Sequence, residues 1–114
     1  MFPFQFNPED GLEPADVRFV DVHVEPWDDN RRVRIHSELT PFKEKPSLEF
    51  TILDASGKDV SSVAVIENIE LKFVITMHIR GAEAGGKYRL LARIFYPELP
   101  EVDQREISFE LPTN

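Results

Sequence analysis

Apolar side chains recur at every second residue along much of this chain, and this alternation constrains the fold more than any other feature of the sequence. It is clearest from Leu71 to Ile79, where Lys72, Thr76 and His78 stand between apolar residues. Successive side chains of a β-strand point to opposite faces of its sheet, so each such segment has one dry face and one wet face. A helix would repeat its apolar residues every 3.6 positions instead. The alternation therefore predicts extended strands.

The same pattern occurs in seven segments, and together they predict an all-β chain. Their apolar positions are Val20, Val22 and Val24; Val33, Ile35 and Leu39; Leu48, Phe50 and Ile52; Val63 and Val65; Leu71 to Ile79; Tyr88, Leu90, Ala92 and Ile94; and Ile107, Phe109 and Leu111. Turn-forming residues lie at most of the junctions. Seven short strands of this kind predict a two-sheet antiparallel sandwich. We divide the chain into an extended aromatic N-terminal arm, residues 1–15, and a sandwich domain, residues 16–114.

The turn at Asp29-Asn30 predicts the register of the first two strands. A two-residue loop at this point makes the numbers of paired residues sum to 59. The register places Val20 opposite Leu39 on the dry face and His23 opposite His36 on the wet face. We expect the first two strands to form a hairpin with these pairs.

Length and charge narrow the classes of partner. The chain has 114 residues, which is enough for one domain. Its 13 basic and 21 acidic side chains give a net charge of -8, and a charge of this sign repels phosphate backbones and anionic lipid. No apolar stretch approaches the roughly 20 residues that cross a bilayer. We expect neither nucleic-acid binding nor membrane insertion. Cysteine is absent and the first ten residues lack the basic start of a leader, so we expect a cytoplasmic location.

Two local sequences carry a resemblance to a known superfamily. Gly86-Lys87-Tyr88-Arg89-Leu90-Leu91-Ala92 and the hairpin Asp-Ala-Ser-Gly-Lys-Asp-Val from Asp54 to Val60 resemble the immunoglobulin-like superfamily, in the broad sense that includes fibronectin type III and bacterial Ig-like modules. The resemblance covers residues 16–112 and implies a seven-stranded Ig-like sandwich, in which the hydroxyl of Tyr88 bonds back to the preceding corner. It also implies that strands one, two, five and four share a sheet and that strands three, six and seven form the other. The bridging cysteines of antibody domains are missing.

The turn at Gly57 carries a prediction of its own. A glycine there can adopt a positive φ and close a hairpin. We therefore expect the third and fourth strands to be hairpin neighbours.

Motifs for catalysis and cofactor binding are missing from the sequence. It contains no Gly-x-Ser-x-Gly, no Gly-x-Gly-x-x-Gly, no phosphate-binding Gly-Lys-Ser loop, no His-Glu-x-x-His and no EF-hand pattern. We predict a non-catalytic module without a cofactor.

One outer face of the predicted sandwich carries apolar residues at positions where we expect solvent-exposed polar ones. The outward positions of the sixth strand are Arg89, Leu91, Arg93 and Phe95, and the third strand adds Leu53. Apolar and arginine side chains gathered on an outer face are typical of protein interfaces. These five residues are our predicted interaction surface, for a partner protein or for a second copy in a homodimer.

The N-terminal arm offers an alternative cover for this surface. Phe2, Phe4 and Phe6 alternate along the arm, and either they or the loop 97–102 could fold over it. The three rings could also close an end of the core or add to another subunit's sheet.

Histidines and exposed aromatic residues give two further alternatives for the function. His23, His36 and His78 all fall on wet-face positions, where three imidazoles could bind zinc or copper or titrate together near pH 6.5. Trp27, expected beside Arg32, and Tyr96 could serve a carbohydrate-binding accessory module. We keep metal, small-ligand and carbohydrate binding as alternatives to protein contact.

Overall fold

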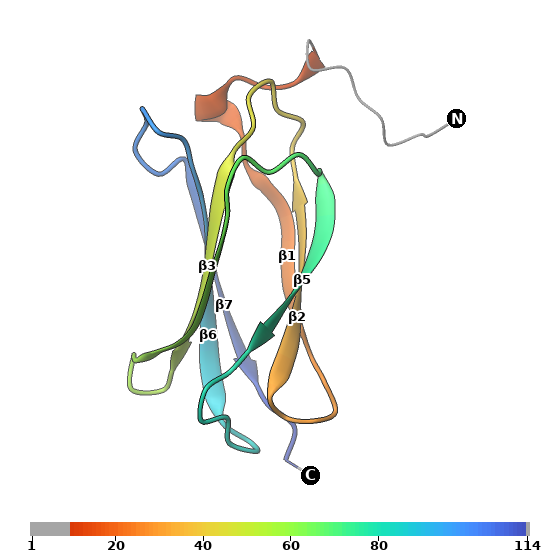
Figure 1. The fold of residues 1–114 in the computed structure, drawn as a ribbon, viewed down its shortest axis with the longest axis vertical. Helices are drawn as coiled ribbons and strands as arrows, with labels where there is room; N and C mark the ends of the chain where they lie inside the picture. Colours follow the sequence, from red (N-terminus) through yellow and green to blue (C-terminus); the bar gives the residue numbers. More distant parts are fainter. Residues whose placement is uncertain (1–9, 114) are drawn as a thin grey trace, which may run out of the picture.

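The computed structural model describes residues 10–113, and these form a sandwich of two antiparallel β-sheets (Figure 1). A short 3₁₀ turn, Pro14–Asp16, precedes the first strand. The strands are β1 Phe19–Pro26, β2 Arg32–Leu39, β3 Ser47–Asp54, β4 Asp59–Val65, β5 Lys72–His78, β6 Lys87–Phe95 and β7 Asp103–Glu110. The prediction of an all-β chain with seven strands in two antiparallel sheets is confirmed. Within residues 10–113 there is no helix long and apolar enough to span a bilayer.

The two sheets have the orders β1-β2-β5 and β4-β3-β6-β7. The implied grouping of the fourth strand with the first, second and fifth is therefore wrong, while the β3–β4 hairpin is confirmed. The reason lies in the turn between them. Gly57 has a φ of 90°, and the Asp54 carboxylate accepts hydrogen bonds from the backbone N–H groups of Ser56 and Lys58 at 2.9 and 3.0 Å. A turn this tight keeps β4 beside β3.

The β1–β2 hairpin follows the predicted register along most of its length. His23 lies opposite His36 as expected, but Leu39 pairs with Phe19 and not with Val20. A bulge displaces the register between Phe19 and Asp21, which turns the Val20 side chain toward solvent. Val20 is 53% exposed and Phe19 is 2% exposed. The prediction that Val20 faces the core is wrong.

The core fills the space between the two sheets. Phe50 on β3 is fully buried, and its ring lies 6.4 Å from the rings of both Phe19 and Phe73. Inward residues of β2, β3 and β6 pack around these rings, and these are Val33, Ile35, Leu48, Ile52, Leu90, Ala92 and Ile94. The inward positions named from alternation on these strands are confirmed.

Tyr88 forms the corner contact that the resemblance implied. Its hydroxyl oxygen accepts a hydrogen bond from the backbone N–H of Glu83 at 3.3 Å. Gly86 lies between them, and a Cβ at this position would sit 3.0 Å from the Tyr88 hydroxyl and 2.9 Å from the Glu83 carbonyl oxygen. The corner therefore requires a glycine at Gly86.

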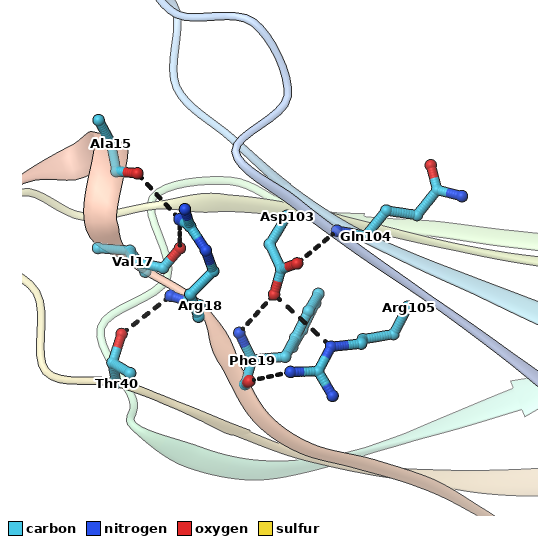
Figure 2. Close-up of polar contacts among 8 residues, drawn as sticks. All are labelled: Ala15, Val17, Arg18, Phe19, Thr40, Asp103, Gln104 and Arg105. Carbon is cyan, nitrogen blue, oxygen red and sulfur yellow. Dashed lines mark hydrogen bonds and ion pairs between the residues drawn. The ribbon is translucent and has the colours of Figure 1, made fainter.

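Side chains from β7 cover the beginning of the free edge of β1, at Phe19 (Figure 2). The N–H of Phe19 donates to Oδ2 of Asp103 at 2.9 Å, and Nη2 of Arg105 donates to the Phe19 carbonyl at 2.6 Å. The two side chains also pair with each other, with Nε of Arg105 3.7 Å from Oδ2 of Asp103. They supply the donor and acceptor that a neighbouring strand would offer. This edge of the three-stranded sheet is consequently tied to the four-stranded sheet.

Candidate functional site

The five residues of the predicted interaction surface come together on the outer face of the four-stranded sheet. Arg89, Leu91, Arg93 and Phe95 follow one another at every second position of β6, and Leu53 on β3 lies directly opposite Arg89. All five side chains are half-buried. We call this surface the β3–β6 face.

Ion pairs hold the two arginines of the β3–β6 face. Arg93 pairs with Glu49 on β3, and its Nη1 lies 3.7 Å from Oε1 of Glu101 in the β6–β7 loop. Nη1 of Arg89 lies 3.5 Å from Oε2 of Glu106 on β7. These ion pairs neutralise the charge of both guanidinium groups locally.

The apolar residues of this face are divided by the arginines. Leu91 stands between Arg89 and Arg93 on β6, and Phe95 follows Arg93. A hollow of about 260 Å³ lies beside Phe95, and its lining residues are Glu49, Arg93, Phe95 and Glu101. The loop 97–102 reaches the face through Glu101. The arrangement offers small apolar contacts framed by ion pairs, which suits a protein surface better than a deep ligand pocket.

Two of the three predicted histidines meet on the outer face of the three-stranded sheet. The rings of His23 and His36 stack with their centroids 4.5 Å apart and their planes within 6°. Nδ1 of His23 lies 2.8 Å from Oδ2 of Asp21, and Nε2 of His36 lies 2.9 Å from Oε1 of Glu25. The hydrogen bond to His36 lowers the pKa of the Glu25 carboxyl. Each imidazole therefore has a carboxylate partner at its edge.

The third histidine lies apart from this pair. His78 is opposite Arg32, whereas the β5 residue opposite His36 is Val74. Val74 and His78 are four positions apart along β5, which is about 13 Å. Among residues 10–113 no three His, Cys, Asp or Glu side chains are grouped so that they could hold a metal ion. The structure thus brings two of the proposed ligands together and leaves the third away from them.

The aromatic residues considered for carbohydrate binding differ in their surroundings. Trp27 has the guanidinium carbons of Arg32 and Arg34 over its ring, at 4.0 and 4.6 Å from the centroid, so the expected contact with Arg32 is confirmed. Tyr96 is 6% exposed. It donates its hydroxyl to the Glu44 carbonyl at 2.9 Å, and burial raises its pKa to about 12. Tyr96 presents no open ring face to a sugar.

Sequence reasoning missed a group of exposed apolar residues at one end of the sandwich. Ile66 and Ile69, in the loop after β4, are each 68% exposed. Asn68, between them, is buried, and its backbone N–H donates a hydrogen bond to the Pro46 carbonyl at 2.8 Å. Leu12 and Leu99, also exposed, belong to segments at this end, the upper end in Figure 1. The signal available in the sequence was the run Val60–Ile66, which contains no charged residue.

The N-terminal arm is only partly described. Phe2, Phe4 and Phe6 lie outside the described residues, so their packing and the arm boundary stay predictions. Within the described part, Leu12 bridges in parallel to Phe42, with its N–H 3.0 Å from the Pro41 carbonyl. The chain is therefore already in contact with the sandwich at Leu12.

Comparisons with known proteins place the chain by its fold. No protein-family model matches the sequence, and a search of curated proteins gives no match. Among solved structures, a β-glucuronidase of Bifidobacterium dentium complexed with coumarin-3-O-glucuronide is similar, with a TM-score of 0.68 and 18% identity over 86% of this chain and 18% of that chain. A glycosyl hydrolase family 2 member from Bacteroides cellulosilyticus is similar with a TM-score of 0.62 and 17% identity, over 83% of this chain and 14% of that chain. The β-glucuronidase of Ruminococcus gnavus is similar with a TM-score of 0.58 and 14% identity, over 84% of this chain and 16% of that chain.

These likenesses show a shared β-sandwich fold. At 14–18% identity they carry no catalytic residue across to this chain. The chain also spans less than a fifth of the length of these three proteins. The similarity is therefore to one domain-sized portion of a larger protein.

Proposed function

We propose that this chain is a non-catalytic, Ig-like β-sandwich module that docks a partner protein on its β3–β6 face. The observation that carries the proposal is the register of that face. Leu53 lies opposite Arg89, and Leu91 and Phe95 lie on the same side of β6. Three large apolar side chains share an outer face with arginines whose charges are already paired. A partner that covers the apolar side chains and leaves these ion pairs at the solvated rim avoids the cost of desolvating them.

The comparisons support an accessory role. In each of the three similar glycosidases, the portion that resembles this chain makes up 14–18% of the protein. A sandwich of this size thus occurs there beside other parts of a large enzyme. We propose a glycoside hydrolase as the class of partner for this chain, with the sandwich contributing contact and not chemistry.

The composition of the face supports the same conclusion. Arginine and aromatic residues provide much of the binding energy at protein interfaces when surrounding contacts exclude water. On this face, the Glu49–Arg93 pair lies between Leu91 and Phe95. These charges form the polar surroundings that a small apolar contact needs.

Capture from the native organism, followed by binding of the identified protein, tests the proposal. The test variant is Leu91→Glu/Phe95→Glu, and the matched control is Val74→Glu/Thr76→Glu, which adds the same charge to the exposed outer face of the other sheet. We expect the wild type and the control to bind one purified partner alike. We expect the test variant to bind at least about 30-fold more weakly, as the loss of a hot spot of about 2 kcal/mol requires. Equal binding by all three proteins would reject the β3–β6 face.

A further inference from the structure

The two lateral sides of the sandwich differ in how the sheets end. On one side β1 and β7 contact each other, and the side chains of Asp103 and Arg105 bind the backbone of Phe19. On the other side the end strands are β4 and β5. Within residues 10–113, β5 has β2 as its one partner strand. In this part of the chain no strand lies on the outer side of β5.

The backbone groups at this edge belong to alternate residues of β5. In an antiparallel ladder, every second residue bonds to the neighbouring strand and the residues between point away from it. The N–H of Leu39 on β2 donates to the carbonyl of Leu71, just before β5, at 2.8 Å. The N–H of Ile79, just after β5, donates to the Arg31 carbonyl at 2.8 Å. The odd-numbered residues of β5 therefore bond to β2, and the backbone groups of the even-numbered residues face the edge.

The side chains along β5 are also incompletely covered. Phe73 and Ile75 face the core but are only partly buried, whereas Ile35, opposite Ile75 on β2, is fully buried. Val74 on the outer face is 53% exposed. No residue from Phe73 to Met77 carries a charge, although charged side chains are a usual protection of sheet edges. A further strand beside β5 would bury apolar surface on both faces.

The N-terminal arm has a sequence that suits this edge. Phe2, Phe4 and Phe6 alternate with Pro3 and Gln5, and residues 1–8 contain no charged side chain. Three rings at every second position give an extended segment one apolar face. The arm therefore offers apolar surface to an apolar edge and brings no charge that would have to be desolvated.

The arm is attached close to the beginning of β5. The N–H of Leu12 donates to the Pro41 carbonyl at 3.0 Å. Pro41 lies two residues after Leu39, which bonds to Leu71 directly before β5. Residues 10–13 and the beginning of β5 lie at the same end of the sandwich, the upper end in Figure 1. Phe6 is six positions before Leu12, and six extended residues span up to about 20 Å. The arm is therefore long enough to reach β5.

We propose that residues 2–7 of the arm add to β5 of the same chain as an antiparallel strand, with Gln5 opposite Val74. This inference goes beyond the proposed function, since it concerns the β5 edge and not the β3–β6 face. The register matches the three rings to the three inward residues of β5, in the pairs Phe6 with Phe73, Phe4 with Ile75, and Phe2 with Met77. Ladder bonds form at Gln5 and Asn7, and the ladder ends at Pro3, which has no N–H to donate.

Direction and tethering favour β5 of the same chain over β4 and over a second copy. An arm that enters at the upper end runs antiparallel to β5, whose residue numbers rise away from that end, and parallel to β4, whose numbers fall. Parallel pairing is slightly less stable per residue, and the Arg80 N–H already binds the Val60 carbonyl at the beginning of β4. A short tether gives an effective concentration on the order of millimolar. The net charge of -8 on each chain opposes exchange of arms between copies.

Cysteine cross-linking tests the pairing, because the chain has no cysteine of its own. Residues of a hydrogen-bonded pair have Cα atoms about 5.5 Å apart, within the range that a disulfide spans. The test pair is Gln5→Cys/Val74→Cys. The matched controls are Gln5→Cys/Ala64→Cys, on the β4 edge, and Gln5→Cys/Thr51→Cys, on the β3–β6 face.

Under mild oxidation, we expect the test pair to form a disulfide within one chain at least about tenfold faster than either control pair. Electrophoresis without reductant separates this product from chains linked in pairs. A control pair that cross-links as fast as the test pair overturns the proposal. A test pair that mainly links two chains overturns it as well, because the arm would then belong to a second copy.

Hydrogen exchange tests the pairing in a chain without cysteines. In the proposed ladder the Val74 N–H donates to the Gln5 carbonyl. Phe4→Ser removes the central ring and should speed exchange of the Val74 N–H by at least about tenfold, whereas Gln5→Ser keeps all three rings and should change it by less than about twofold. An exchange rate at Val74 that is the same in the wild type and in Phe4→Ser overturns the proposal.

The two proposals fail in different experiments. Preferred cross-linking of the arm to Thr51 would place the arm on the β3–β6 face and overturn its pairing with β5. Partner binding by Leu91→Glu/Phe95→Glu judges the β3–β6 face alone, because neither residue takes part in the pairing with β5.

Discussion

The edges of β1 and β4 show two ways in which a sheet can end. At β1, the backbone of Phe19 is bound on both its N–H and its carbonyl by side chains of β7, and the bulge at Val20 breaks the regular ladder beside it. At β4, Ser62 to Val65 continue as a regular strand without a charge. The Phe19 end of the first edge is tied to the other sheet, whereas β4 ends its sheet with β3 as its one partner strand.

The difference shows that edge protection and stability can come from the same residues. Asp103 and Arg105 remove backbone groups from solvent and also cross-link the sheets. Without such residues, an edge contributes less to the stability of the monomer but keeps the capacity to bind a strand. Mutations on the β1 edge should therefore lower the stability of the monomer more than mutations on the β4 edge.

The largest expected effect is on stability at the β1 side. Phe19→Ala should lower the free energy of unfolding by about 3–5 kcal/mol, because a buried ring in contact with Phe50 leaves a cavity. Val63→Ala on β4, which is only partly buried, should cost about 1 kcal/mol. Urea denaturation of both variants measures the difference. Equal losses would contradict the contrast between the two edges.

Removal of the Asp103 carboxylate should have the next largest effect. Asp103→Ala leaves the Phe19 N–H without its acceptor, which should cost about 1–3 kcal/mol. Hydrogen exchange at the Phe19 amide should become faster, while exchange at the Ser62 amide on β4 should not change. Glu106→Ala, exposed on the same strand, is the control for a general effect of altering β7. Unchanged exchange at Phe19 would show that the carboxylate does not protect this edge.

Acid should weaken both sides of the sandwich through different carboxylates. The hydrogen bond to His36 lowers the pKa of Glu25 on β1, and the hydrogen bond to the Ser56 side chain lowers the pKa of Asp54 at the β3–β4 turn. A lowered pKa in the folded state contributes stability above the unfolded values, about 4.3 for Glu and 3.9 for Asp, and this stability is lost as the pH falls through the folded value. Glu25→Gln and Asp54→Asn should therefore each lose less stability than the wild type between pH 6 and pH 3. Urea midpoints across this range that fall in parallel for all three proteins would contradict the assignment.

The smallest effect should come from Val20. Because the bulge leaves Val20 53% exposed, Val20→Thr should change the free energy of unfolding by less than about 0.5 kcal/mol. Val22→Thr, two residues along β1 and 9% exposed, should be clearly more destabilising, since it buries a hydroxyl. Thermal unfolding of the pair gives the comparison. A larger loss at Val20 would place that side chain in the core after all.

Period-two alternation predicted the strands and much of the packing because both depend on local burial. The register of His23 with His36 followed from the loop length alone. The bulge beside Val20 did not follow from the loop length. It lies next to Phe19, whose backbone bonds to Asp103 and Arg105, 84 and 86 residues further along the sequence. Contacts between distant segments leave no periodic signal in either segment.

The candidate sites were predicted to different extents for the same reason. Neighbours on one strand, such as Leu91 and Phe95, could be assigned to a common face from their spacing. The separation of His78 from the other histidines required the β2–β5 register, which no short loop fixes. Exposure of Ile66 and Ile69 required the conformation of the loop after β4, where Glu67 has a φ of 51°. Alternation of apolar residues predicts strands, but it gives no information on the conformation of such loops.

The closure of β1 by β7 also has a consequence for the order of events during synthesis. Phe19 and Asp103 are 84 residues apart, and a ribosome adding about 5–20 residues per second takes roughly 4–17 seconds to make that interval. Throughout this time the nascent chain has its first strand without the side chains that seal it. Until β7 is made, the Phe19 backbone therefore lacks the two partners that cover it, and this end of β1 is open to misassembly.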